Sequence, residues 1–181
     1  MGRDAGWIAL EAGLAGRAHI ILIPEIPYQL EKVLEKIHLR KEGGSPFSII
    51  VVAEGAKEIG KDAITNELPS NHLQGVAQLG GVGYYVAREI GERIDLEVRC
   101  TVLGHTQRGG TPLAFDRVLG TRLGTEAVQA AAEEKFGNMV ALQGRKIIFV
   151  PLKSLARIVR QVPLDSQLIR TAESIGLCLG R

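Results

Sequence analysis

The chain is poor in cysteine, in aromatic residues and in net charge, and each shortage excludes a class of protein. Its two cysteines, Cys100 and Cys178, form no CxxC pair and no cluster with histidine, so neither a disulfide framework nor a structural zinc site is expected. Aromatic residues make up 4% of the chain and the formal net charge is +2, so no nucleic-acid surface is expected. This cysteine usage is typical of a reducing, cytoplasmic compartment.

Long hydrophobic runs are missing too. The longest, at 20–23 and 49–53, fall far short of the roughly 20 apolar residues that a membrane-spanning helix needs. Charged Arg3, Asp4 and Glu11 interrupt the region where a signal peptide would be apolar, so we expect no membrane association and no leader. The 45% of hydrophobic residues suffice for a core without disulfides.

The apolar residues follow patterns that predict strands alternating with helices. Short runs rich in β-branched residues are typical of buried parallel strands, and they lie at 19–23, 47–53 and 97–103. Helical periodicity occurs between them, at 4–15, 28–41, 80–94, 111–134 and from 163 to the end. Thr111-Pro112 is expected to begin the fourth of these helices, because proline suits a first helical position. This order predicts an α/β fold.

Two further segments depart from that alternation. Residues 138–142 and 146–150 are predicted as paired strands, joined by a turn at 143–145. Residues 56–79 carry several turn formers and are interpreted as a surface insertion with a short helix near 72–79.

Polar residues follow two of the predicted strands at the end where parallel sheets bind ligands. Glu54 follows the strand at 47–53, and a loop at 104–110 follows the strand at 97–103. In that loop Arg108 offers planar donors that match phosphate, and His105 can donate to an oxyanion or a hydroxyl. Arg99 adds a second cation. A carboxylate beside these cations suits a sugar phosphate.

Other interpretations stay open from composition alone. The loop at 104–110 could be a plain turn, and Glu54 could be solvated or ion-paired. His19, His38 and His72 have no partners at metal-ligand spacing, so we expect them to lie at the surface or to be satisfied locally.

A long segment resembles the signature of the 6-phosphofructokinases. It reads Thr101-Val102-Leu103-Gly104-His105-Thr106-Gln107-Arg108-Gly109-Gly110-Thr111-Pro112, followed by Phe115-Asp116-Arg117. Shorter segments agree in the same order, namely Met1-Gly2-Arg3 with Gly6, Pro24-Glu25, Val52-Ala53-Glu54-Gly55 and Gly137-Asn138-Met139-Val140-Ala141-Leu142-Gln143. The chain is identified as a member of this family over almost its whole length, and residues 59–78 resemble an insertion of its longer forms.

The resemblance implies a fold and a division of the chain. The fold is a three-layer α/β/α parallel-sheet lobe with part of a second lobe. Residues 1–108 would form the smaller, sugar-phosphate-binding lobe. Residues 109–160 would return to the larger, donor-binding lobe, and 161–181 would form a C-terminal helix.

The family phosphorylates fructose 6-phosphate to fructose 1,6-bisphosphate in glycolysis, with Mg²⁺ and either ATP or pyrophosphate as donor. The resemblance implies that Met1, Gly2 and Arg3 contact fructose 6-phosphate. Arg3 would also lie near the transferred phosphoryl group and stabilise its charge. Glu54 would accept hydrogen bonds from sugar hydroxyls.

The remaining site residues implied by the resemblance are cationic. His105 and Arg108 would bind the 6-phosphate. Arg99 would reach the same phosphate from a neighbouring subunit, which implies a homo-oligomer, either a dimer or a tetramer.

Some of the family's segments have no counterpart in these 181 residues. The Gly-Gly-Asp donor segments and the Thr-Ile-Asp-Asn-Asp segment with the general-base aspartate precede Met-Gly-Arg in the family. We therefore expect the chain to supply the acceptor side, to hold no metal itself and to have little or no kinase activity alone. The alternatives are a non-catalytic sugar-phosphate-binding module or a damaged gene product. The family's effector site would lack its acid at 17–19 and its lysines at Gly43 and Ser45, so regulation there is not expected.

Overall fold

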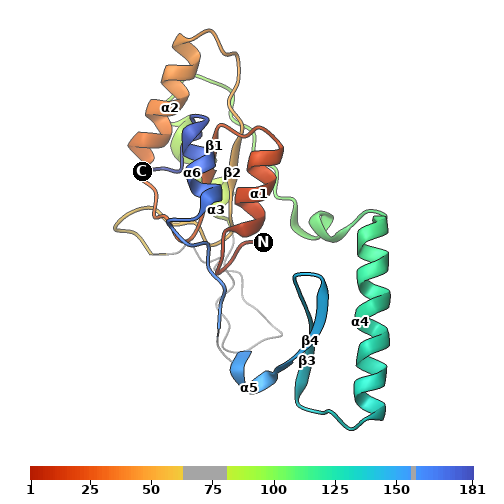
Figure 1. Cartoon of the computed structure of the whole chain (residues 1–181). Coiled ribbons are helices and arrows are strands. Elements are labelled where there is room, and N and C mark those ends of the chain that lie inside the picture. The colour runs from red at the N-terminus through yellow and green to blue at the C-terminus, as the bar shows by residue number, and fades with distance from the viewer. Residues whose placement is uncertain (63–80, 156–157) are drawn as a thin grey trace, which may run out of the picture. The chain divides into compact units, whose positions relative to one another are not determined.

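A computed structural model describes residues 1–62, 81–155 and 158–181 of the chain, in two compact units (Figure 1). Unit 1 comprises Met1–Gly104 and Val159–Arg181, and unit 2 comprises His105–Ile158. Residues 161–181 thus pack with unit 1. The functional lobes predicted at 1–108, 109–160 and 161–181 stay a prediction, because compactness alone does not tell which substrate a lobe binds.

Unit 1 is built on a short parallel sheet. Strand β1 (Ile20–Leu22) pairs with β2 (Ile50–Val52), and Ile21 lies opposite Val51. The other edge of β1 is paired as well, because the Ile21 N–H donates to the Cys178 carbonyl at 2.9 Å and the Cys178 N–H donates to the His19 carbonyl at 3.0 Å. The strands predicted at 19–23 and 47–53 are therefore confirmed, though both are shorter.

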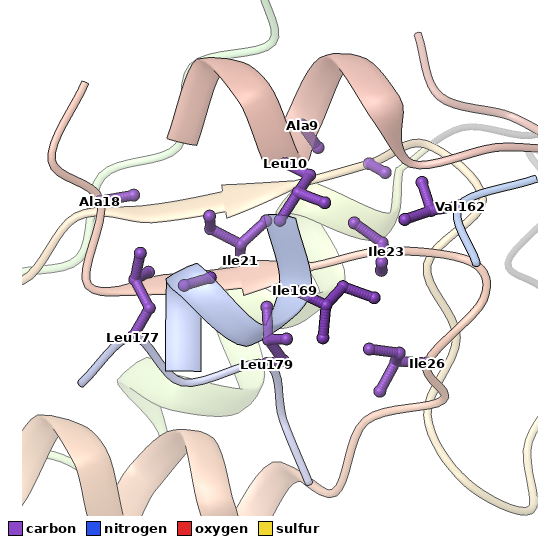
Figure 2. Packing of buried hydrophobic residues seen from close by; sticks show 12 residues of the cluster. Ala9, Leu10, Ala18, Ile21, Ile23, Ile26, Val162, Ile169, Leu177 and Leu179 are labelled. Carbon is purple, nitrogen blue, oxygen red and sulfur yellow. The ribbon is translucent and has the colours of Figure 1, made fainter. Parts of the chain in front are cut away.

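Helices cover both faces of this sheet. They are α1 (Trp7–Ala15), α2 (Leu30–Glu42), α3 (Val82–Gly91) and α6 (Gln167–Ser174). Successive side chains of a strand point to opposite faces, so Ile21 and Ile23 pack with Leu10 of α1 and Ile169 of α6 (Figure 2). On the opposite face, Ile20 and Leu22 belong to a second cluster with residues of α2 and α3. The predicted three-layer α/β/α arrangement is confirmed.

The sequence of α2 shows why this segment is helical. Leu30, Val33 and Ile37 are buried and recur at the spacing of one helix face. Glu31 lies in the first turn, and Arg40 and Lys41 lie in the last, where each charge complements the helix dipole.

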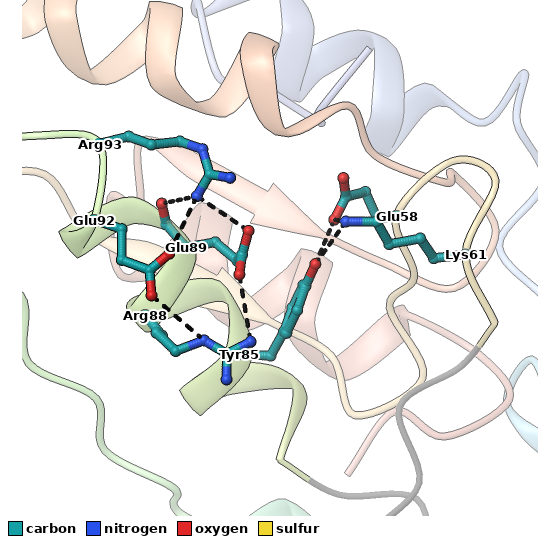
Figure 3. A network of polar contacts seen from close by, with 7 residues as sticks. All are labelled: Glu58, Lys61, Tyr85, Arg88, Glu89, Glu92 and Arg93. Carbon is teal, nitrogen blue, oxygen red and sulfur yellow. Dashed lines mark hydrogen bonds and ion pairs between the residues drawn. The ribbon is translucent and has the colours of Figure 1, made fainter.

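A polar network joins α3 to the segment before residue 63 (Figure 3). The Tyr85 hydroxyl donates to Glu58 Oε2 at 2.9 Å, and Lys61 Nζ lies 2.8 Å from the Tyr85 oxygen and 3.0 Å from the same carboxylate. Glu89 of α3 is buried and pairs with Arg93 at 3.0 Å. The short helix predicted near 72–79 and most of the predicted insertion lie outside the described residues.

A 3-10 helix, η1 (Gly104–Arg108), lies at the boundary, with all its residues after Gly104 in unit 2, and α4 (Ala114–Ala132) follows in unit 2. A hairpin of β3 (Asn138–Gln143) and β4 (Lys146–Pro151) comes next, with Gln143 opposite Lys146, and α5 (Leu152–Leu155) follows. The predicted hairpin and its turn are confirmed. Gly144 in that turn has φ +59°, which glycine adopts without strain.

Three sequence predictions need correction. The prediction of a strand at 97–103 is wrong, because these residues form no ladder with any described residue. Helix α4 begins at Ala114 rather than at Pro112, because Asp116 Oδ2 accepts from the Leu113 N–H at 2.8 Å and holds Leu113 extended before the first turn. The last helix ends at Ser174, and Gly176, with φ +81°, turns the chain back towards β1. Within the described ranges, every helix is too short or too polar to cross a membrane.

Candidate functional site

The segments Met1–Arg3 and Glu54–Gly55 lie side by side beyond the carboxyl end of β2. The Glu54 N–H donates to the Met1 carbonyl and the Gly55 N–H donates to the Gly2 carbonyl, each at 3.0 Å. The amino nitrogen of Met1 lies 3.3 Å from Glu54 Oε2. Two segments far apart in the sequence thus form one site at the sheet edge where parallel sheets bind ligands.

Two glycines make this close approach sterically feasible. A Cβ on Gly55 would collide with the carbonyl oxygen of Arg3. Gly2 has φ +80°, and a Cβ there would lie 2.9 Å from the Cβ of Ala53. Because other residues would separate the two segments, glycine at both positions brings the Arg3 backbone against the segment that follows β2.

Glu54 remains accessible in this arrangement. Its side chain is 33% exposed, and the neighbouring Met1 is half-buried. An ionised carboxylate is an acceptor only, so Glu54 can accept hydrogen bonds from ligand hydroxyls. Arg3, which is also half-buried, follows directly in the same segment and brings a permanent positive charge.

His105 and Arg108 lie in η1 of unit 2, and both are exposed. In a 3-10 helix, residues three apart lie above one another, as the positions of His105 and Arg108 do. The Gly109 N–H donates to the Thr106 carbonyl at 3.0 Å and closes the turn. The pair therefore offers hydrogen-bond donors from one short, hydrogen-bonded element.

Arg99 lies in unit 1, in the segment that precedes η1. Its side chain is 83% exposed, and its Nη2 lies 2.7 Å from Glu97 Oε1. An exposed ion pair of this kind contributes little to stability, so Arg99 could exchange Glu97 for a phosphate at small cost.

The structure thus brings together Met1, Gly2, Arg3 and Glu54 in one unit, and His105 with Arg108 in the other. Within residues 1–62, 81–155 and 158–181, no three His, Cys, Asp or Glu side chains gather to hold a metal ion.

Comparison with known proteins identifies the family. The family model described as Phosphofructokinase matches residues 1–131. The ATP-dependent 6-phosphofructokinase of Chloroflexus aggregans is 48% identical over 180 residues, which cover 99% of this chain and 48% of that protein. The pyrophosphate–fructose 6-phosphate 1-phosphotransferase of Amycolatopsis methanolica is 51% identical over 163 residues, covering 90% of this chain and 47% of that protein.

A solved structure agrees with these matches. The T-state phosphofructokinase of Pichia pastoris superposes with a TM-score of 0.66 at 32% identity, covering 97% of this chain and 18% of that chain. The chain spans about half the length of the curated relatives it matches. With a family model over most of its residues and such identity along nearly all of them, the chain belongs to the phosphofructokinase family.

Proposed function

We propose that these 181 residues form the acceptor side of a 6-phosphofructokinase, which in the whole protein phosphorylates fructose 6-phosphate on its 1-hydroxyl as a step of glycolysis. The observation that carries the proposal is the pairing of Met1–Gly2 with Glu54–Gly55. It supports the proposal because the carboxylate and Arg3 then lie beyond the carboxyl end of β2, where parallel sheets commonly bind ligands. The relatives' names include both an ATP-dependent and a pyrophosphate-dependent enzyme, so either donor fits.

Each side chain has a role that its chemistry supports. Glu54 accepts hydrogen bonds from sugar hydroxyls. Arg3 stabilises the negative charge of the transferred group, as arginines do in phosphoryl transfer. His105 and Arg108 bind the 6-phosphate, since charge-assisted bonds from a planar guanidinium match phosphate oxygens.

Arg99 completes the phosphate site from a neighbouring subunit in this proposal. Its exposure and its weak partner Glu97 support such a role, because both leave the guanidinium available to another chain. The protein would then act as a homo-oligomer, a dimer or a tetramer.

We assign the donor and its Mg²⁺ to no residues among those described. Mg²⁺ is bound by carboxylates together with substrate phosphates, and the described residues contain no cluster of acidic side chains that would hold it. No step of phosphoryl transfer is therefore assigned to a metal ion or a nucleotide in this chain.

Binding of fructose 6-phosphate to the purified chain, measured by isothermal titration calorimetry, tests the proposal. Arg108→Ala should weaken binding by about 1.5–3 kcal/mol, because a charged partner of the phosphate is lost. Arg145→Ala, which removes an exposed arginine of the hairpin turn in the same unit, is the control. Equal affinity for wild type and Arg108→Ala, or no binding at all, contradicts the proposal.

A coupled assay with fructose 6-phosphate and either ATP or pyrophosphate tests whether these residues supply only the acceptor side. We expect little or no turnover from the 181 residues alone, since donor binding is assigned elsewhere. Robust turnover with either donor would show that the acceptor-side assignment is too narrow.

A further inference from the structure

The carboxylate of Glu25 joins three segments of unit 1. Its Oε1 accepts from the Gly6 N–H at 2.9 Å and from the Val162 N–H at 2.8 Å, and its Oε2 lies 3.1 Å from the same Gly6 nitrogen. Glu25 itself follows β1 after Ile23 and Pro24, and its side chain is half-buried. One side chain thus holds backbone of two segments that lie far apart in the sequence, at Gly6 and at Val162.

Helix α1 explains why a carboxylate is needed at this place. The helix follows Gly6, which has no capping side chain, and its first turn contains no acidic residue. A carboxylate at a helix N-terminus satisfies free N–H groups and complements the positive end of the dipole. A Cβ on Gly6 would lie 2.9 Å from Glu25 Oε2, so glycine makes room for this distant cap.

The cap also holds the second end of the segment Met1–Gly6, which contains Arg3. Met1 and Gly2 are held through their carbonyls by the amides of Glu54 and Gly55, and Gly6 is held through its amide by Glu25. Arg3 lies between these two attachments. The segment is therefore fixed at both ends, whereas an attachment at one end would let Arg3 move with the start of α1.

Further contacts connect the start of α1 to the segment around Val162, the second partner of Glu25. The Trp7 Nε1–H donates to the Arg160 carbonyl at 2.7 Å, and the Arg160 guanidinium lies 5.8 Å from the centre of the Trp7 ring. Val162 is buried in the core cluster that includes Leu10. The start of α1 is thus held from a second direction, which restricts its movement relative to the sheet.

We propose that Glu25 is a positioning residue, which holds Met1–Arg3 against Glu54 in the geometry that binds the sugar phosphate. It does so without contacting the ligand, through Gly6 and the first turn of α1. The link to the sugar phosphate rests on the proposed function, whereas the anchoring of the segment does not.

Amide hydrogen exchange in the ligand-free 181-residue chain tests the anchoring. Glu25→Ala should speed exchange at the amides of Glu54 and Gly55 about tenfold or more, because loss of charged hydrogen bonds releases the segment they hold. The amides of Ala53 and Tyr28, bonded to Leu22 and Lys57, should keep their rates. Glu25→Gln retains an acceptor and should give a smaller increase at the same two amides.

Glu35→Ala is the matched control, because Glu35 is an exposed carboxylate of α2 that pairs with Lys32. It should leave all these rates unchanged. Unchanged exchange at Glu54 and Gly55 in Glu25→Ala overturns the proposal, and so does equal acceleration at every amide, which would mark a merely structural role. If Glu25→Ala does not fold, the exchange rates of the Glu54 and Gly55 amides in Glu25→Gln provide the test. Rates equal to wild type at both amides would overturn the proposal.

Affinity for fructose 6-phosphate, measured by calorimetry, separates this inference from the proposed function. Glu25→Ala should weaken it about tenfold and Glu25→Gln less, while affinity for inorganic phosphate stays unchanged. A wild-type chain that does not bind fructose 6-phosphate overturns the proposed function, and the exchange rates still decide whether Glu25 anchors Met1–Arg3. Wild-type affinity in a folded Glu25→Ala chain overturns the positioning role.

Discussion

Units 1 and 2 contain helices and paired strands alike, yet they bury their side chains very differently. Unit 1 packs two apolar clusters, one on each face of its sheet. In the described part of unit 2 only Ala130 is buried, while Phe115, Val128 and Phe136 are exposed. The elements of unit 2 are formed by local hydrogen bonds, whereas those of unit 1 depend on packing between residues distant in the sequence.

The largest expected difference between the units comes from removing the same side chain in each. Val33 in α2 is fully buried, and Val128 in α4 is 72% exposed. Val33→Ala should lower the free energy of unfolding by about 1.5–3 kcal/mol, because a buried valine loses its packing. Val128→Ala should leave it unchanged or raise it slightly, since alanine favours helices. Urea unfolding followed by far-UV circular dichroism measures both, and equal losses would contradict the comparison.

Adding a methyl group should change stability in opposite directions in the two units. A Cβ on Gly13 of α1 would lie 2.5 Å from Ile21 Cδ1, whereas a Cβ on Gly124 of α4 would meet no atom within 4 Å. Gly13→Ala should therefore destabilise unit 1 by about 1–3 kcal/mol through overpacking. Gly124→Ala should stabilise its helix by about 1 kcal/mol. The same unfolding measurement applies, and a stabilising Gly13→Ala would show that α1 packs more loosely than described.

The smallest expected effect is a pH-dependent change in stability that comes from His19 in unit 1. His19 Nδ1 accepts from the Ile49 N–H at 2.8 Å, so the ring must be neutral at that nitrogen. Partial burial, with Arg40 and Lys36 nearby, lowers the pKa of His19 below its usual 6.5. Because the pKa of His19 is lower in the folded protein than in the unfolded chain, neutral His19 stabilises the fold. This stabilisation is fully present above about pH 6.5 and is lost as the pH falls through the pKa of the folded state.

The His19 effect is measured as the change in unfolding free energy between pH 7.5 and 5. His19→Asn should flatten this pH dependence relative to wild type, because the asparagine oxygen accepts without titrating. His105→Asn, which replaces an exposed histidine of unit 2, is the control and should retain the wild-type profile. Identical pH profiles for all three proteins would show that His19 does not contribute to the pH dependence of stability.

The sequence predicted the hairpin of unit 2 almost to its bounds, because its turn is local, and it predicted the buried elements of unit 1 from their apolar patterns. The apolar runs around β1 and β2 and the periodicity of α2 reappear as strand and helix, because burial fixes them. Residues 97–103 also contain β-branched residues, but a strand requires a partner strand as well, and pairing partners are not encoded locally. Their misassignment therefore has a non-local cause.

The candidate site also combines features that the local sequence predicts with features that only the folded chain shows. Glu54 was predicted from its place after a strand, which is local information. Its contact with Met1 and Gly2 depends on the course of the folded chain and was accessible only through the resemblance. The anchoring by Glu25 was missed because its partners, Gly6 and Val162, are remote in sequence. One local signal existed, namely a helix that begins after glycine without a cap or an acid in its first turn.

The pairing of Cys178 with β1 has a consequence for the order of events during protein synthesis. The ribosome makes Cys178 after all of unit 2, so until then β1 has one unpaired edge, which invites association with other chains. Unit 2 forms its elements from neighbouring residues, and such local structure forms quickly. We therefore expect the unit that begins later in the sequence to acquire its structure before the unit that begins first is complete.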